Sequence, residues 1–292
     1  MELIRVNNLD YMYPINDGEK ALKNVSLSIR EGKLYAVIGK NGTGKTTLCN
    51  VLRGFIPHFH KGSLEGEVVV EGKDIRHWTM SELAKNIGFI FQNPFTQISG
   101  VKDTVFGEIA YGLENLGVEV PEIKKRVKQV IQLLNIEELA DKNPYELSGG
   151  QKQRVAFAAV IVMDPDILVI DEPTSQLDPK GTRDIFDMIK WMKEQGKTII
   201  LVEHKLELIA EHADYLFVMN DGRIITEGNV EDVLSNPALI DYEAGLPQYA
   251  RLGIELNKRS SDFGQIPIHR SQAEAEIKKW LGIHVNQGGS GS

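Results

Sequence analysis

The chain has 292 residues, of which 42% are apolar and 25% charged, a balance typical of a folded protein and unlike that of a disordered one. This length suits one compact α/β domain with a modest appendage, which argues against two independent enzymes. The formal net charge of -8 argues against nucleic acid as a partner, because a phosphate-rich polymer would be repelled on average.

The first predicted elements are strands. Apolar and polar residues alternate over residues 3–9 and 25–29, which predicts two half-buried strands of an antiparallel edge layer. The apolar run Leu34–Ile38 ends at Gly39, as expected of a central parallel strand that leads into a loop and a helix. Similar runs occur at residues 88–91, 167–170, 198–202 and 215–219. Helical patterns separate most of them, so we expect a mostly parallel core sheet wrapped by helices.

A helical insertion and a small extension are predicted next. Strand signals disappear between residues 92 and 147, where helical patterns near 105–116 and 122–134 predict a subdomain over about residues 93–165. Past residue 228 the pattern becomes irregular, with three prolines, until a final helix at 271–281. We therefore expect a main domain over residues 1–228, an extension over 229–285 and an artificial Gly/Ser linker over 286–292.

A glycine-rich loop follows the predicted central strand. Its sequence, GKNGTGKT at residues 39–46, fits the phosphate-loop pattern and stands between a buried strand and a helix. Glycines let backbone N–H groups turn around an anion, and the helix points its positive end at the same place. Lys45 would reach the β- and γ-phosphates of ATP, and the Thr46 hydroxyl would bind Mg²⁺. The predicted nucleotide-binding residues here are Gly39, Asn41, Gly42, Thr43, Gly44, Lys45, Thr46 and Thr47.

Two adjacent carboxylates, Asp171 and Glu172, end a second predicted buried strand. Because side chains alternate along a strand, we expect the two acids to face different directions. Asp171 is placed to hold the Mg²⁺ shell, and Glu172 to orient and polarise an attacking water. Acids after a strand are also common as helix caps, but the phosphate loop disfavours that interpretation here.

A third motif distinguishes between the families that use a phosphate loop. Residues 147–155 read LSGGQKQRV, which matches the signature of ABC ATPases and lies shortly before the acidic strand, as in that family. Gln92, Asp178 and His204 follow the same order of motifs. Over residues 3–228 the chain therefore resembles an ABC ATPase, which implies a P-loop NTPase core with an antiparallel edge layer and a helical insertion.

The resemblance also implies roles for single residues. Tyr13 would stack on the adenine, and Gln92 would link the Mg²⁺ ion and the water to a transport subunit. His204 would contact the γ-phosphate, and Asp178 would cross a dimer interface. The catalytic set would then be Glu172, His204, Lys45 and Gln92, and the metal set Thr46, Gln92 and Asp171.

The signature has a physical interpretation of its own. Ser148, Gly149 and Gly150 begin a predicted helix, so their N–H groups and the helix dipole form an anion site. In ABC ATPases this site, which includes Gln151, binds the γ-phosphate held by the other subunit. Two ATP molecules would therefore join a second ATPase subunit, the same or a paralogous chain, to this one, and hydrolysis would separate the pair.

A closer resemblance concerns residues near Gln92. The stretches 91–97 (FQNPFTQ), 105–108 (VFGE) and 112–115 (GLEN) are similar to the ATPases of energy-coupling factor importers, including the cobalt and thiamin-precursor systems. Residues 246–256 are similar to their C-terminal extension, which adds contacts between the two ATPases. The resemblance implies a transmembrane scaffold, a substrate-binding membrane subunit and a peripheral position at the cytoplasmic face of the cell membrane.

Other features bear on the location and on rival functions. Cys49 is the only cysteine, which excludes an internal disulfide and predicts a reducing compartment. No stretch approaches the length of a membrane span, so another chain would provide the passage, and a fused exporter is disfavoured. The alternative is a non-transport ABC ATPase that acts on nucleic acid or ribosomes. Such proteins carry a long coiled coil or two phosphate loops, and neither occurs here.

Two local differences from the family pattern and one pair of histidines remain to be interpreted. Gln176 and the Glu203-His204-Lys205 sequence differ from the frequent family pattern, which affects only the expected communication between the two ATP sites. His58 and His60 are too few for a closed zinc site, and no cysteine lies near them in the sequence. We expect them in a surface loop.

Overall fold

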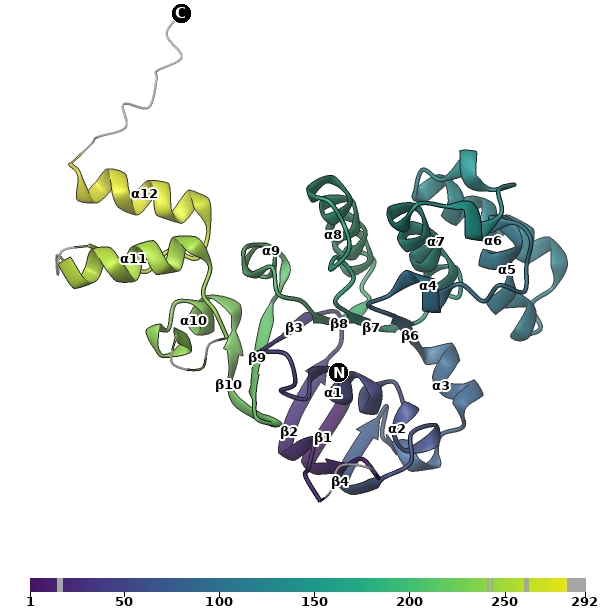
Figure 1. Cartoon of the computed structure of the whole chain (residues 1–292), viewed down its shortest axis with the longest axis horizontal. Coiled ribbons are helices and arrows are strands. Elements are labelled where there is room, and N and C mark those ends of the chain that lie inside the picture. The colour runs from purple at the N-terminus through teal and green to yellow at the C-terminus, as the bar shows by residue number, and fades with distance from the viewer. Residues whose placement is uncertain (15–17, 241, 243, 260–262, 283–292) are drawn as a thin grey trace, which may run out of the picture.

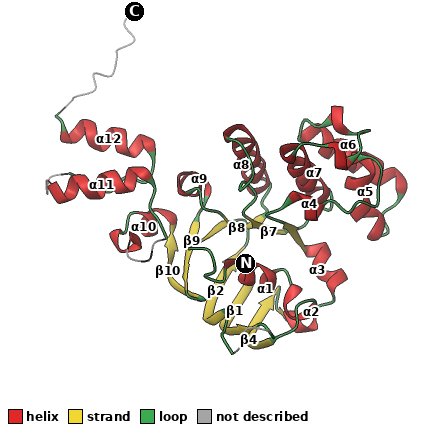
Figure 2. Ribbon diagram, in the orientation of Figure 1, coloured by secondary structure: helices red, strands yellow, loops and turns green. Residues whose placement is uncertain are grey.

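The computed structural model describes residues 1–14, 18–240, 242, 244–259 and 263–282; the predicted linker at 286–292 lies outside the described residues. Its strands form two sheets (Figures 1 and 2). The antiparallel sheet contains, in spatial order, β2 (Leu22–Arg30), β1 (Glu2–Met12), β4 (Ser63–Val70) and β5 (Lys73–Asp74). The second sheet contains β10 (Arg223–Asn229), β9 (Tyr215–Asn220), β3 (Leu34–Ile38), β8 (Thr198–Val202), β7 (Ile167–Asp171) and β6 (Ile87–Ile90).

The second sheet is parallel from β9 to β6, and only β10 pairs antiparallel, with β9. Every residue of β3, β7 and β8 is buried, as expected of parallel strands that are covered on both faces. The carboxyl ends of β3, β7 and β8 meet at one edge of this sheet, where the loops that follow them lie together.

The helices are α1 (Lys45–Leu52), α2 (Phe55–His58), α3 (Met80–Asn86), α4 (Pro94–Gln97), α5 (Val105–Asn115), α6 (Val120–Leu133), α7 (Gly149–Ile161), α8 (Pro179–Glu194), α9 (Leu206–His212), α10 (Val230–Leu234), α11 (Gln248–Arg259) and α12 (Arg270–Trp280). In Figure 1, α4 to α7 gather at one end of the molecule, and α11 and α12 lie at the other. Figure 2 shows the antiparallel strands below the parallel sheet, on the side away from α8 and α9.

Two hydrophobic cores lie on opposite faces of the parallel sheet. Tyr35 and Val37 of β3 face the antiparallel sheet and α1, whereas Leu34, Ala36 and Ile38 face the helices from α5 to α9. This division follows from the alternation of side chains along a strand. Helix α1 is therefore held between the two sheets, and the loop that precedes it is anchored at both ends.

Cys49 lies in the core on the α1 side. It is 1% exposed, and burial raises the pKa of its thiol well above the ordinary value. The thiolate is the reactive form of cysteine, so this residue contributes packing rather than chemistry.

Several elements are absent from the sequence-based prediction. Strands β4 and β5 complete the antiparallel sheet, and α11 occupies residues that the pattern marked as irregular. That interpretation is wrong because Pro247 precedes α11 instead of interrupting it: the Arg251 N–H donates to the Pro247 carbonyl oxygen at 3.0 Å. The predicted final helix is α12, but only Ala273 of its apolar face is buried, and Trp280 is 39% exposed.

Candidate functional site

The loop between β3 and α1 has the backbone conformation of an anion cradle. Gly39, Gly42 and Gly44 have φ values of 151°, 83° and 98°, which favour glycine. A Cβ atom at Gly39 would lie 2.3 Å from the Met219 carbonyl oxygen, so no larger residue fits there. The N–H groups that begin α1 complete the cradle.

Lys45 turns back into this loop. Its Nζ donates to the carbonyl oxygens of Gly39 and Lys40, each at 2.9 Å. The side chain is buried, which lowers the pKa of its ammonium group, while the charges of Glu172 and Asp171 oppose that shift. Phosphate oxygens would be stronger acceptors than these carbonyls, because both partners of the hydrogen bond would then be charged.

Asp171 and Thr46 form a small oxygen-rich site beside Lys45. Burial raises the pKa of the Asp171 carboxyl, while a hydrogen bond from the Thr46 hydroxyl opposes the shift. Asp171 Oδ1 is buried and has no partner among the described residues. Those residues contain no group of three or more His, Cys, Asp or Glu that could hold a metal ion. The two oxygen ligands fit Mg²⁺, which takes few protein ligands when nucleotide phosphates supply others.

Asp171 carries a cost in stability that can be measured. A raised carboxyl pKa means that stability is lost as the pH rises through the folded-state pKa, because the buried group must then ionise. We expect Asp171→Asn to raise the free energy of unfolding of the nucleotide-free chain at pH 8, because asparagine removes the buried charge. The gain should vanish at a pH below the unfolded-state pKa, where both forms are neutral. Denaturant unfolding at the two pH values tests this, and a loss of stability at pH 8 would contradict it.

Glu172 meets two other predicted residues. Gln92 Nε2 donates to Glu172 Oε2 at 2.7 Å, and His204 Nε2 lies 2.8 Å from Glu172 Oε1. Gln92 follows β6 by two residues and His204 follows β8, so three neighbouring strand ends bring the group together. The Glu172 side chain is 15% exposed, which leaves it within reach of a water molecule.

The two acids diverge for a reason that the sequence did not predict. Glu172 lies just past the end of β7 and has a φ of 45°, in the left-handed region. Strand alternation is therefore the wrong explanation, because a turn of the backbone separates Asp171 from Glu172. Such a conformation is strained for a non-glycine residue and is stabilised here by the Glu172 N–H, which donates to the Val202 carbonyl oxygen at 2.9 Å.

The signature begins α7. Ser148 is the N-cap, its Oγ accepts from the Gln151 N–H, and Gln151 Oε1 accepts from the Ser148 N–H in return. Ser148, Gly150 and Gln151 line a pocket of about 260 Å³ together with Asp178, whose carboxylate caps α8. No residue of the phosphate loop lines this pocket. Within one chain, therefore, the structure does not bring the signature and the phosphate loop into one site.

Tyr13 lies beside the phosphate loop. Its hydroxyl is 3.2 Å from the Thr47 hydroxyl, and its ring packs edge-on against Tyr11. His60 approaches the same ring, and the His58 Nε2 lies 2.8 Å from the Ile75 carbonyl oxygen. Both histidines are half-buried, but His58 is the last residue of α2, so only His60 lies in a loop as predicted.

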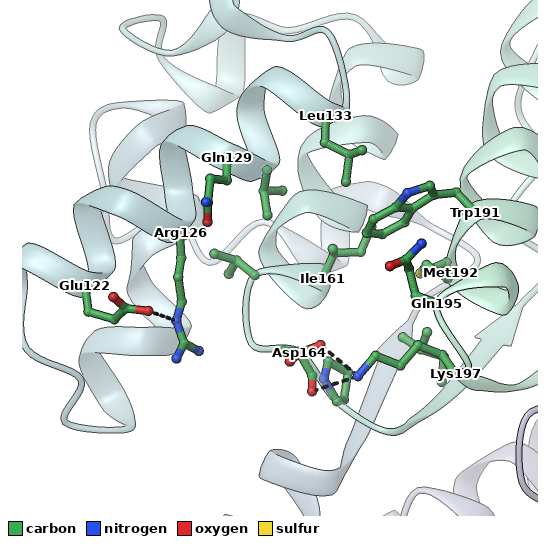
Figure 3. A pocket seen from close by; sticks show the side chains of 14 residues that line it. Glu122, Arg126, Gln129, Leu133, Ile161, Asp164, Trp191, Met192, Gln195 and Lys197 are labelled. Carbon is green, nitrogen blue, oxygen red and sulfur yellow. Dashed lines mark hydrogen bonds and ion pairs between the residues drawn. The ribbon is translucent and has the colours of Figure 1, made fainter.

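A pocket of about 700 Å³ lies away from these residues, between α6, the end of α7 and α8 (Figure 3). Arg126 binds Glu122 on one side of it, and Lys197 binds Asp164 on the other. No predicted site residue lines it. It lies at the junction of the helical subdomain and the core.

Comparison with known proteins places these motifs in a family. The profile of the family described as ABC transporter matches residues 22–175, more than half of the chain. The chain belongs to the ABC transporter family. It is an ATP-binding and ATP-hydrolysing subunit of that family, and its fold is the ABC ATPase cassette, as the sequence predicted.

Three similar proteins are informative. The energy-coupling factor transporter ATP-binding protein EcfA2 of Clostridium perfringens is 38% identical over 282 residues, which cover 94% of this chain and 96% of that protein. The structure of cbiO1 from Clostridium perfringens, part of the ABC transporter complex cbiONQ, has a TM-score of 0.71 and 33% identity over 89% of this chain and 96% of that one. A dimeric post-hydrolysis ATP-binding cassette bound to ADP and Pi has a TM-score of 0.69 and 28% identity over 78% of this chain and 99% of that one.

The ABC subunit has no helix, within the ranges that the structure describes, that is long and apolar enough to cross a membrane. The sequence predicts Gln92, Asp171, Glu172 and His204 as site residues, and the structure brings Gln92, Glu172 and His204 into contact. Glu203 and Lys205 lie in the part of the sequence that differs from the frequent family pattern and have no predicted role in the site. Both make specific contacts close to the site, which only the fold reveals.

Proposed function

We propose that this ATPase powers a membrane importer of the energy-coupling factor type for a vitamin or a metal ion. The similarity to EcfA2 and to cbiO1, over nearly the whole of the chain, carries the proposal. The chain would bind a transmembrane scaffold and a substrate-binding membrane subunit at the cytoplasmic face of the membrane. The net charge of -8 disfavours nucleic acid as the object on which the ATPase acts.

The residues then take the following roles. Lys45 and the N–H groups of the loop would hold the phosphates, and Thr46 and Asp171 with Gln92 would hold Mg²⁺, which would neutralise charge on the phosphates. Glu172 would accept the proton of the attacking water. His204 would hold the Glu172 carboxylate in position and would itself contact the γ-phosphate. The proximity of the Glu172, Gln92 and His204 side chains supports this assignment.

The second ATPase subunit completes the site. Ser148 and its helix end form an anion site that cannot reach the phosphate loop of the same chain, since the two line different parts of the surface. A head-to-tail pair would bring the helix end of one copy to the triphosphate of the other. The dimeric form of a related cassette bound to ADP and Pi supports this arrangement.

The surface near Gln92 is the proposed contact with the membrane scaffold. Phe95 lies in α4, three residues after Gln92 along the chain, and is 54% exposed. A tagged chain should co-purify from detergent-solubilised membranes with a polytopic membrane protein and a smaller one. Phe95→Glu should reduce this recovery severalfold, while Val120→Glu, at an equally exposed apolar residue of α6, should not. Recovery of ribosomes or nucleic acid in place of membrane proteins would contradict the proposal.

A further inference from the structure

The neighbours of His204 both bind one residue of another loop. Thr174, in the loop between β7 and α8, is 1% exposed. Its hydroxyl donates to Oε1 of Glu203, and its carbonyl oxygen accepts from Nζ of Lys205 at 3.2 Å. The residues before and after His204 therefore bind the hydroxyl and the carbonyl oxygen of a single buried threonine.

Each side of this contact is reinforced. Glu203 is 3% exposed, and its Oε2 accepts from the His204 N–H at 2.5 Å and from the Lys205 N–H at 3.4 Å. Lys205 Nζ also donates to Oγ1 of Thr182 at 2.7 Å, in the first turn of α8. A buried polar side chain such as that of Glu203 is costly unless it is hydrogen-bonded, and these contacts supply its partners.

The loop held in this way carries two residues of the proposed site. Thr174 stands two residues after Glu172 and four before Asp178. Its carbonyl oxygen also accepts from the Leu177 N–H at 3.2 Å, so the turn toward Asp178 starts at the same atom that Lys205 binds. The segment of His204 and the loop of Glu172 and Asp178 are thus joined at Thr174.

We propose that Glu203 and Lys205 form a clamp on Thr174 and Thr182 that couples the position of His204 to that of the loop bearing Glu172 and Asp178. They are positioning residues: the Glu203 side chain binds the Thr174 hydroxyl, and the Lys205 side chain binds the Thr174 carbonyl oxygen and the Thr182 hydroxyl. The inference rests on the proposed roles of Glu172, His204 and Asp178. In that scheme a shift of His204 toward a γ-phosphate moves Asp178, which faces the other subunit, through the clamp.

Lys205→Met tests the clamp, because it keeps the length of the side chain and removes its donors. We expect kcat for ATP hydrolysis to fall about tenfold, with KM and the ATP dissociation constant of the isolated chain within about twofold of the parent. Lys205→Arg, which retains donors, should recover kcat to within about threefold. Lys197→Met is the matched control. Lys197 directly precedes β8, and among the described carboxylates it pairs only with Asp164 and Asp166.

Thr182→Val keeps the shape of the acceptor residue and removes Oγ1. If Lys205 acts through Thr182, the kcat of the double variant Lys205→Met, Thr182→Val should lie within about twofold of the kcat of Lys205→Met alone. The two losses are then not additive, because both substitutions remove the same contact. If Lys205 has only a structural role, Lys205→Met should lower the melting temperature and alter KM, and Lys205→Arg should fail to restore kcat. That result would overturn the clamp. An unchanged kcat in Lys205→Met would do the same. If His204→Ala also left kcat unchanged, the proposed site itself would be wrong.

Discussion

Glu172→Gln is expected to reduce ATP turnover by about 10²- to 10⁴-fold, the usual contribution of a general base. Glutamine has nearly the same shape and can still accept from Gln92, but it cannot take a proton from water. ATP affinity should stay within about twofold of the parent, because Glu172 contacts Gln92 and His204 rather than the phosphate loop. With ATP and Mg²⁺ the variant should accumulate as a dimer.

Steady-state phosphate release and size-exclusion chromatography with light scattering measure the two parts of this prediction. Glu114→Gln serves as the control, since Glu114 is an exposed carboxylate of α5 that pairs with Lys102. Turnover by Glu172→Gln equal to that of the control would show that another group activates the water.

Ser148→Arg should abolish productive pairing while single chains still bind ATP. Ser148 is exposed at the start of α7, so an arginine there leaves the core intact and blocks the approach of another subunit. Turnover should fall by about 100-fold or more, since the completed site requires both copies. ATP affinity of the monomer, measured by titration calorimetry, should change by no more than about twofold.

Ser148→Ala separates this effect from the loss of the helix cap. Alanine removes the bond from the Gln151 N–H and costs about 1 kcal/mol of stability, but it leaves the surface open. Its turnover should exceed that of Ser148→Arg by at least about tenfold. Loss of ATP binding by monomeric Ser148→Arg would place the signature in the site of its own chain and would contradict the two-chain arrangement.

Most of the fold follows from patterns that are local in the sequence. Strands β3, β7 and β8 are continuous apolar runs because both of their faces are covered, and this burial is what makes them visible without a structure. The phosphate loop can be predicted from the sequence because its conformation requires glycine, as at Gly39, where a Cβ atom would clash with the Met219 carbonyl oxygen. The helix that begins at the signature is visible because Ser148 and Gln151 cap each other.

The features that escaped prediction depend on distant residues. The Thr174 contacts join residues 29 and 31 positions apart in the chain, and no local pattern reports them. The left-handed backbone of Glu172 depends on its bond to Val202 of the neighbouring strand. In the extension, Pro247 has the same appearance in sequence whether it precedes a helix or interrupts one, and only the path of α11 distinguishes the two.

A crystal structure with Mg²⁺ and a non-hydrolysable ATP analogue tests the central claim most directly. The account predicts a head-to-tail pair in which the triphosphate contacts Lys45 of one copy and the Ser148 helix end of the other. A triphosphate held by one chain alone, with the signature of its neighbour turned away from it, would contradict the account.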